Sequence, residues 1–264
     1  AHTHNRIYKP IEVNGAKIVQ CGCHGAFVSN FTIELEDKKI KICDYEMLKV
    51  DDSIPENEAM AQLVNKSLEP YEDMRTKNIG RTKMVLHRYN TLNSTMDELL
   101  LKATAHATDT SIVFSNGWRY GAPIPVGSIT ENDLYNIAPM NPPLSTVELT
   151  GKEIKQMLEE NLERTFSSDA FKQMGGYVKR VLGLQINMRI ENPTGHRIQE
   201  IYYNGKHLEM DKTYRVSFIT IQGVPKKYGK NRIEHPPKAV EAMKMYLKVH
   251  PDFNSDPIGS FRLV

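Results

Sequence analysis

Two histidines at the start of the chain, His2 and His4, have a spacing that suits metal binding. On an extended segment, residues two positions apart point to the same side. Neutral imidazoles are good ligands for zinc, manganese or iron. Many surface histidines share this spacing, and a metal site needs three or four ligands, which the neighbouring sequence does not supply. Alone, the pair is weak evidence for a metal site.

A glycine turn after an apolar run is a candidate binding loop. The run Ser111–Phe114 predicts a buried strand. It is followed by the turn Asn116-Gly117 and then by three large side chains, Trp118, Arg119 and Tyr120. Arginine carries a planar fork of donors that suits phosphate, carboxylate or a similar oxyanion. The alternative is that Trp118 packs in the core and Arg119 is a solvated loop charge.

A second candidate loop contains two adjacent glycines. Gly175 and Gly176 permit unusual backbone angles. Aromatic and basic side chains surround them, including Phe171, Tyr177, Lys179 and Arg180. Such a set suits a planar or anionic ligand. A hydrophobic plug beneath a long loop explains the same residues equally well.

Composition limits the classes of protein that fit. The chain has 264 residues, 40% of them apolar, and a formal net charge of +2. Balanced charge argues against a nucleic-acid-binding surface, and no apolar run approaches the roughly 18 residues of a membrane span. Cys21, Cys23 and Cys43 are too few for a disulfide framework and are interpreted as small thiols rather than a zinc site. Because Ala1 begins like the interior of a longer sequence, we expect a fragment.

The pattern of elements predicts an α+β protein. Strands are expected at 10–13 and 16–19 around Asn14-Gly15, then at 27–36 and 39–50. An amphipathic helix over 51–79 connects them to a second domain. That domain is expected to place helices on a largely antiparallel sheet. Its predicted strands are 82–87, 111–114, 144–149, 184–190, 197–203, 214–221 and 258–264, and its helices 95–107, 130–137, 150–162 and 239–249. A long basic loop is expected over 222–235.

Several motifs together resemble a known family. HTHN at 2–5 is similar to the end of the last metal-binding motif of calcineurin-like metallophosphoesterases, and Gly-x-His-Gly at 22–25 resembles the segment after that motif. SNGWR at 115–119, ITENDLYNIAPMN at 129–141, VELTGKEI at 147–154 and NGKHLEMDKTYRV at 204–216 resemble the C-terminal domain of bacterial 5′-nucleotidases. The resemblance implies a β-rich remnant of the metallophosphoesterase domain at 1–50, a helical linker at 51–79 and a mixed α/β substrate-binding domain at 80–264.

The resemblance also implies roles. His2 and His4 would be metal ligands, for two divalent ions such as manganese or zinc that the full-length protein binds. No catalytic residue is expected in this chain, because the upstream metal motifs are absent, so the fragment alone is expected to bind no metal and to be inactive. The partners would be the missing N-terminal catalytic domain and a small anionic substrate, a nucleotide. The expected location is periplasmic, cell-surface or extracellular. The substrate-facing residues would be Asn116, Trp118, Arg119, Tyr120, Asn141, Gly175, Gly176, Tyr177, Arg180 and Phe218.

One departure from the nucleotidase pattern leaves alternatives open. The segment that holds the nucleoside in typical members, rich in glycine with an aspartate, reads SFITIQGVPKKYG here, with only Phe218 and Tyr228 aromatic. The two candidate loops look closer to the SoxB-type proteins of thiosulfate oxidation. A SoxB-like thiosulfohydrolase is therefore the first alternative, and a non-catalytic ligand-binding module is the second.

Overall fold

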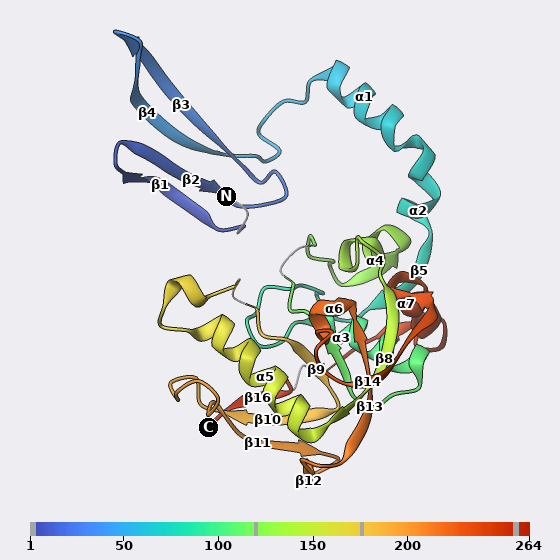
Figure 1. The fold of residues 1–264 in the computed structure, drawn as a ribbon. Coiled ribbons are helices and arrows are strands. Elements are labelled where there is room, and N and C mark those ends of the chain that lie inside the picture. Colours follow the sequence, from blue (N-terminus) through green and yellow to red (C-terminus); the bar gives the residue numbers. More distant parts are fainter. Residues whose placement is uncertain (1–3, 119–120, 175–176, 256–258) are drawn as a thin grey trace. The chain divides into compact units, whose positions relative to one another are not determined.

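The computed structural model describes residues 4–118, 121–174, 177–255 and 259–264 (Figure 1). The chain divides into two compact units, the first ending at Pro70 and the second running from Tyr71 to Val264. The predicted α+β class is confirmed, since several helices accompany β-sheets.

The first unit contains two antiparallel hairpins. Strands β1 (Arg6–Val13) and β2 (Ala16–Cys21) are joined by Asn14 and Gly15, whose φ angles of 49° and 79° are those of a tight hairpin turn. Strands β3 (Phe27–Glu36) and β4 (Lys39–Lys49) pair along their whole length. The hairpins predicted from the sequence are confirmed.

The described residues of the first unit enclose no core. None of residues 4–70 is buried, and Leu35 and Ile40 are 74% and 67% exposed. Helix α1 (Glu58–Leu68) begins at Asn57, which caps it, and continues through the 3₁₀ turn η1 (Glu69–Tyr71) into α2 (Glu72–Thr76). Isolated hairpins are marginally stable in water, so these strands need another apolar surface to pack against.

A five-stranded sheet organises the second unit, in the order β14-β8-β13-β6-β9. Its strands are β14 (Lys230–Lys238), β8 (Pro143–Thr150), β13 (Thr213–Ile219), β6 (Val113–Ser115) and β9 (Arg180–Leu182). The central pair β13 and β6 is parallel, whereas the other pairs are antiparallel.

Two smaller sheets flank the central one. The first has the order β12-β11-β10-β16, with β12 (Lys206–His207), β11 (Ile198–Tyr203), β10 (Leu184–Met188) and β16 (Phe261–Leu263). The second has the order β15-β5-β7, with β15 (Asp252–Phe253), β5 (Asn78–Thr82) and β7 (Gly127–Thr130).

Helices cover the central sheet and complete two hydrophobic cores. On one face, α5 (Gly151–Phe166) packs with β10 and β11 over Phe114 and Phe218. On the other, α3 (Thr95–Thr108), α4 (Glu131–Ile137) and α7 (Ala239–Val249) pack over Leu144 and Ile219. The short helix α6 (Thr220–Gly223) and the 3₁₀ turn η2 (Ala170–Lys172) complete the unit.

Local sequence signals explain where the helices begin. Thr130 and Asp133 form a capping box at α4, and Thr150 and Glu153 form another at α5, as the sequence predicts. Ser94 caps α3. No helix of the described residues is long and apolar enough to cross a membrane.

Two sequence-based predictions for the second unit are wrong. The strand expected at 82–87 lies at Asn78–Thr82, where β7 and β15 supply its partners, and only an isolated bridge from Leu86 to Ile124 follows. The loop expected at 222–235 instead contains the end of α6 and most of β14. Gly223, Pro225, Gly229 and basic residues suggested a loop there, but Lys230–Lys238 pairs with β8 as an edge strand of the central sheet.

Candidate functional site

Four segments converge at one edge of the central sheet. Strands β6 and β13 are parallel neighbours, with Phe114 paired to Phe218, so the residues that follow them emerge together. Strands β9 and β8 run antiparallel to this pair, so the residues that precede them reach the same edge. The carboxyl edge of adjacent parallel strands is a common place for ligand sites. The segments are 116–118, 220–223, 177–179 and 141–142.

Gln222 joins three of these segments. Its side-chain oxygen Oε1 accepts hydrogen bonds from Asn116 Nδ2 and from Trp118 Nε1, the latter at 3.3 Å. Its main-chain oxygen accepts a hydrogen bond from Lys179 Nζ. The turn after β13 is therefore tied to the loop after β6 and to the segment before β9.

Close backbone packing fixes two of the same segments. A Cβ atom added at Gly117 would lie 2.2 Å from the carbonyl oxygen of Val178, so only glycine fits there. Asn161 Nδ2 and Thr165 Oγ1, both on α5, donate to the Tyr177 carbonyl at 2.9 and 2.8 Å. Helix α5 therefore anchors the segment that Gly117 contacts.

The backbone is strained where β13 ends. Thr220 has a φ of 60°, a left-handed conformation that is unfavourable for a β-branched residue. Its hydroxyl oxygen is buried and has no hydrogen-bond partner among the described residues. Strain of this kind is concentrated at functional sites, and here it shapes the turn that presents Gln222.

Lys179 is a buried cation beside this turn. Its side chain is nearly inaccessible, with the residue 7% exposed. Desolvation, and secondarily the positive charge of Arg164, lowers the pKa of Lys179 to about 8. Its ammonium group is directed to the carbonyl of Gln222. Lys179 therefore holds the backbone of the turn that contains Gln222.

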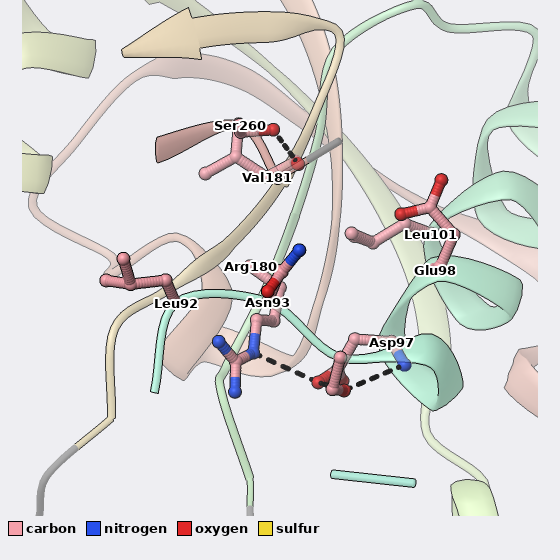
Figure 2. Close-up of a pocket in the computed structure, with 10 residues that line it drawn as sticks. Leu92, Asn93, Asp97, Glu98, Leu101, Arg180, Val181 and Ser260 are labelled. Atoms are coloured by element: carbon pink, nitrogen blue, oxygen red, sulfur yellow. Dashed lines mark hydrogen bonds and ion pairs between the residues drawn. The ribbon is translucent and has the colours of Figure 1, made fainter. Parts of the chain in front are cut away.

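A buried ion cluster lies next to the site (Figure 2). The Asp97 carboxylate, 1% exposed, accepts from Arg88 Nε at 3.3 Å and from Arg180 Nε at 3.0 Å. Ser94 Oγ donates to the same carboxylate at 2.6 Å. Arg180 also donates to the carbonyls of Asn90 and Thr91, and Arg88 donates to the carbonyl of Ile137. The cluster thus links β9 to the start of α3 and the end of α4.

A small cavity adjoins this cluster. It has a volume of about 20 Å³, which suits a single water molecule. Figure 2 shows Asp97, Arg180 and Ser260 around it, and Ser260 Oγ donates to the carbonyl of Val181. Its size excludes an organic substrate, so the cavity belongs to the structural support of the site.

The structure places the predicted site residues in different surroundings. Asn116 and Trp118 lie together at the sheet edge. Asn141 has a φ of 39°, and its side-chain oxygen accepts from the Val240 amide at 2.9 Å, so it caps α7 at that edge. Tyr177 is half-buried in the segment before β9. Phe218 is 2% exposed in the core, with the Arg232 guanidinium 4.6 Å above its ring.

Arg180 belongs to a different group of side chains from the residues at the sheet edge. Arg180 is 2% exposed and forms the ion cluster described above. Five other predicted site residues lie outside the described residues: His2, Arg119, Tyr120, Gly175 and Gly176. The ligand-binding roles of all these residues stay predictions.

The predicted metal ligands belong to the first unit. His4 is exposed, and its ring centroid lies 6.3 Å from that of His24. In the described part of the chain, no group of three or more His, Cys, Asp or Glu side chains is placed to hold a metal ion. The described residues therefore do not form a metal site by themselves, and the role of the His2 and His4 pair stays a prediction.

Sequence reasoning missed Gln222 and Asp97. Gln222 stands in the segment that departs from the nucleotidase pattern, so the departure was a signal that this position has a different task. Asp97 lies in the first turn of α3, where an acidic residue is explained by helix capping alone. The partners of both residues become known only from the tertiary contacts.

Comparisons with known proteins agree with this architecture. The chain is 26% identical over 236 residues to the trifunctional nucleotide phosphoesterase protein YfkN of Bacillus subtilis (strain 168). The match covers 82% of this chain and 16% of that protein. The chain therefore spans a small part of this relative.

Solved structures give matches over nearly the whole chain. A sulfate thiohydrolase SoxB from Thermus thermophilus, in complex with glycerol, matches with a TM-score of 0.86 at 25% identity. That match covers 100% of this chain and 49% of SoxB. A 5′-nucleotidase precursor from Thermus thermophilus has the same fold, with a TM-score of 0.78, 21% identity, and coverage of 94% of this chain and 52% of that one.

The family profile covers the elements that build the sheet edge. The profile described as "5'-nucleotidase, C-terminal domain" matches residues 74–220, more than half of the 264-residue chain. It spans β5 through β13, including the parallel pair and the segments 116–118, 141–142 and 177–179, and it ends at residue 220, before Gln222. The resemblance inferred from the sequence motifs is confirmed. The chain belongs to the 5′-nucleotidase C-terminal domain family.

Proposed function

We propose that this chain is the substrate-binding C-terminal part of a two-metal phosphoester hydrolase that acts on small anionic esters, in particular nucleotides. The observation that carries the proposal is the convergence of four segments at the carboxyl edge of β6 and β13. This edge gathers Asn116, Trp118 and Gln222 on a rigid scaffold, which is what a binding site requires.

The domain organisation forms part of the proposal. Residues 1–50 are the end of a metallophosphoesterase domain, residues 51–79 are a helical linker, and residues 80–264 bind the substrate. The exposed apolar side chains of the first unit support this division, because Leu35 and Ile40 lack a core to pack in. The N-terminal catalytic domain of the full-length protein would cover them.

The roles of the site residues follow from the same proposal. His2 and His4 contribute to a site for two divalent metal ions in the full-length protein, and the fragment alone is inactive. Asn116 and Trp118 lie at the sheet edge and are the best-supported substrate contacts. The other proposed contacts are Arg119, Tyr120, Asn141, Gly175, Gly176, Tyr177, Arg180 and Phe218. The location proposed by family is periplasmic, cell-surface or extracellular.

A SoxB-like thiosulfohydrolase is the second candidate function. The two aromatic side chains of residues 217–229, Phe218 and Tyr228, are 2% and 4% exposed, so neither offers a stacking surface in this structure. The match to SoxB extends over the whole chain. The burial of the two rings favours a substrate without a stacked ring, and the match to SoxB is consistent with this candidate.

Trp118 is a built-in reporter for the test, because it is the only tryptophan and lies at the proposed site. The 264-residue chain is titrated with AMP, UDP-glucose, phosphate and thiosulfate, with fluorescence of the indole ring and thermal melting followed in parallel. A ligand that binds the native state raises its stability by mass action. We expect AMP or UDP-glucose to shift both signals.

Hydrolysis is then measured with the full-length protein in manganese or zinc. Release of phosphate from AMP supports the first candidate. Cleavage of a peptide cysteine thiosulfonate, without phosphate release from any nucleotide, replaces it with the second. Binding of ligands by the chain without turnover by the full-length protein leaves only a binding module.

A further inference from the structure

We propose that Gln222 determines leaving-group specificity by presenting two amide N–H donors to the substrate, and so selects a carbonyl oxygen over an amino group. The inference rests on the proposed function, because it assigns Gln222 to the same site. It names a feature of the substrate, a hydrogen-bond acceptor oxygen on the part that leaves.

The orientation of the Gln222 amide is fixed by its neighbours. An indole N–H only donates hydrogen bonds, so the atom that faces Trp118 Nε1 at 3.3 Å must be the side-chain oxygen. Asn116 Nδ2 donates to the same oxygen. The amide nitrogen Nε2 therefore points away from both, and its two hydrogens have no acceptor among the described residues.

The backbone of Gln222 is held as firmly as its side chain. Lys179 Nζ donates to its carbonyl oxygen, and the left-handed Thr220 fixes the turn two residues earlier. Gly223 packs against Phe114, with an added Cβ lying 3.2 Å from the Phe114 carbonyl oxygen. A donor whose supporting contacts lock its position loses little entropy when it binds a ligand.

Gln222 offers a substrate a neutral hydrogen-bond donor rather than a charge. Gln222 is exposed, and its neighbour Ile221 is 58% exposed. Lys179 is buried, and its ammonium group donates to the main-chain oxygen of Gln222 rather than facing a substrate. Charged donors make the stronger hydrogen bonds to oxyanions, whereas a neutral amide donor suits an uncharged acceptor such as a carbonyl oxygen on the leaving group.

Matched nucleotide pairs test this directly. UMP and CMP differ at base position 4, a carbonyl oxygen against an amino group, and IMP and AMP differ likewise at position 6. With the full-length protein, we expect kcat/KM about three- to tenfold higher for UMP than for CMP and for IMP than for AMP. A factor of ten corresponds to about 1.4 kcal/mol, the scale of one hydrogen bond.

Two substitutions separate recognition from structural support. Gln222→Glu keeps an oxygen for Asn116 and Trp118 but replaces the donors with an acceptor, so we expect both preferences to reverse. Gln222→Met removes donor and acceptor, and we expect both ratios to approach one. Gln156→Met, an exposed glutamine on α5, is the matched control and should leave the ratios at their wild-type values.

The experiment distinguishes failure of the proposed function from failure of the inference about Gln222. Wild-type protein that hydrolyses none of the four nucleotides refutes the proposed function, and the inference with it. Wild-type protein that hydrolyses all four at equal rates refutes only the inference. Retention of both ratios in Gln222→Glu, or an equal loss for all four substrates in Gln222→Met, would also overturn it, because Gln222 would then only position Asn116 and Trp118.

Discussion

The ammonium group of Lys179 donates a hydrogen bond to the main-chain oxygen of Gln222. A buried cation before β9 is thereby joined to the turn after β13, although 43 positions separate the two residues. The position of this turn therefore depends on a lysine whose burial disfavours its charged form. The pH dependence of stability should reveal this dependence.

Lys179 should make the folded protein more stable as the pH rises from about 8 to 10.5. The pKa of Lys179 falls from 10.5 to about 8 in the folded state, so over this window the unfolded chain holds a proton that the folded chain has released. The free energy of unfolding then increases with pH, by about 3 kcal/mol at most. The measurement is urea unfolding at several pH values for wild type and Lys179→Met.

The difference between those two curves isolates Lys179 from other groups that titrate in alkali. It should grow with pH for Lys179→Met. Lys226→Met, which removes an exposed lysine in the loop after α6, is the control for the loss of one positive charge. A constant difference for Lys179→Met would mean that the residue remains charged when folded.

Asp97→Asn should destabilise the second unit severely. The substitution keeps the shape of the side chain but leaves Arg88 and Arg180 without the carboxylate that joins them in the interior. Breaking a buried ion pair from one side costs about 3–5 kcal/mol. Urea unfolding measures the loss, with Glu209→Gln as the control, since its pair with Lys212 is exposed. Equal stability of Asp97→Asn and wild type would show that the ion cluster does not contribute to the free energy of unfolding.

Gly117→Ala should displace the loop that carries Trp118. The added Cβ would lie 2.2 Å from the Val178 carbonyl oxygen, so one backbone segment has to move, at about 1–3 kcal/mol. Gly205→Ala is the control, because its φ of 74° is unfavourable for alanine but its surroundings are open. Only Gly117→Ala should change the emission of Trp118 and weaken ligand binding. Identical spectra for the two variants would argue against a tight contact at Gly117.

Thr220→Gly should stabilise the fold and impair the site. Glycine tolerates the φ of 60° and removes the buried hydroxyl that lacks a partner among the described residues. Relief of about 1–2 kcal/mol of strain exceeds the entropic cost of glycine, which leaves a gain of about 0.5–1 kcal/mol. Thr213→Gly, an exposed position in β13, should instead destabilise by a similar amount. A loss of stability in Thr220→Gly would mean that the turn is not strained.

Local signals in the sequence predict much of the fold. The Asn14-Gly15 turn and the capping boxes of Thr130 with Asp133 and Thr150 with Glu153 depend on residues within a few positions of one another. Their chemistry acts before any tertiary contact forms. The family motifs likewise identify the domain, since they lie on these same elements.

Tertiary pairing decides what the sequence does not predict. The strand expected at 82–87 forms at Asn78–Thr82 because its partners lie in β7 and β15, far along the chain. The polar sequence of β14 is a strand only because β8 provides an edge. The site was predicted in part: Asn116 and Trp118 stand out by type, whereas Gln222 acquires its role only through partners that lie 106 and 104 positions away.

The parallel pairing of β6 with β13 also governs when the site can form. Phe114 and Phe218 are neighbours in the sheet, yet α4, β8, α5 and the β10–β11 hairpin lie between them in sequence. Contacts of such long range form slowly during folding. On the ribosome, the loop of Asn116 must wait until the intervening elements have been synthesised before Gln222 can reach it. We therefore expect a nascent chain to acquire ligand affinity abruptly and late, once β13 and the turn after it have emerged.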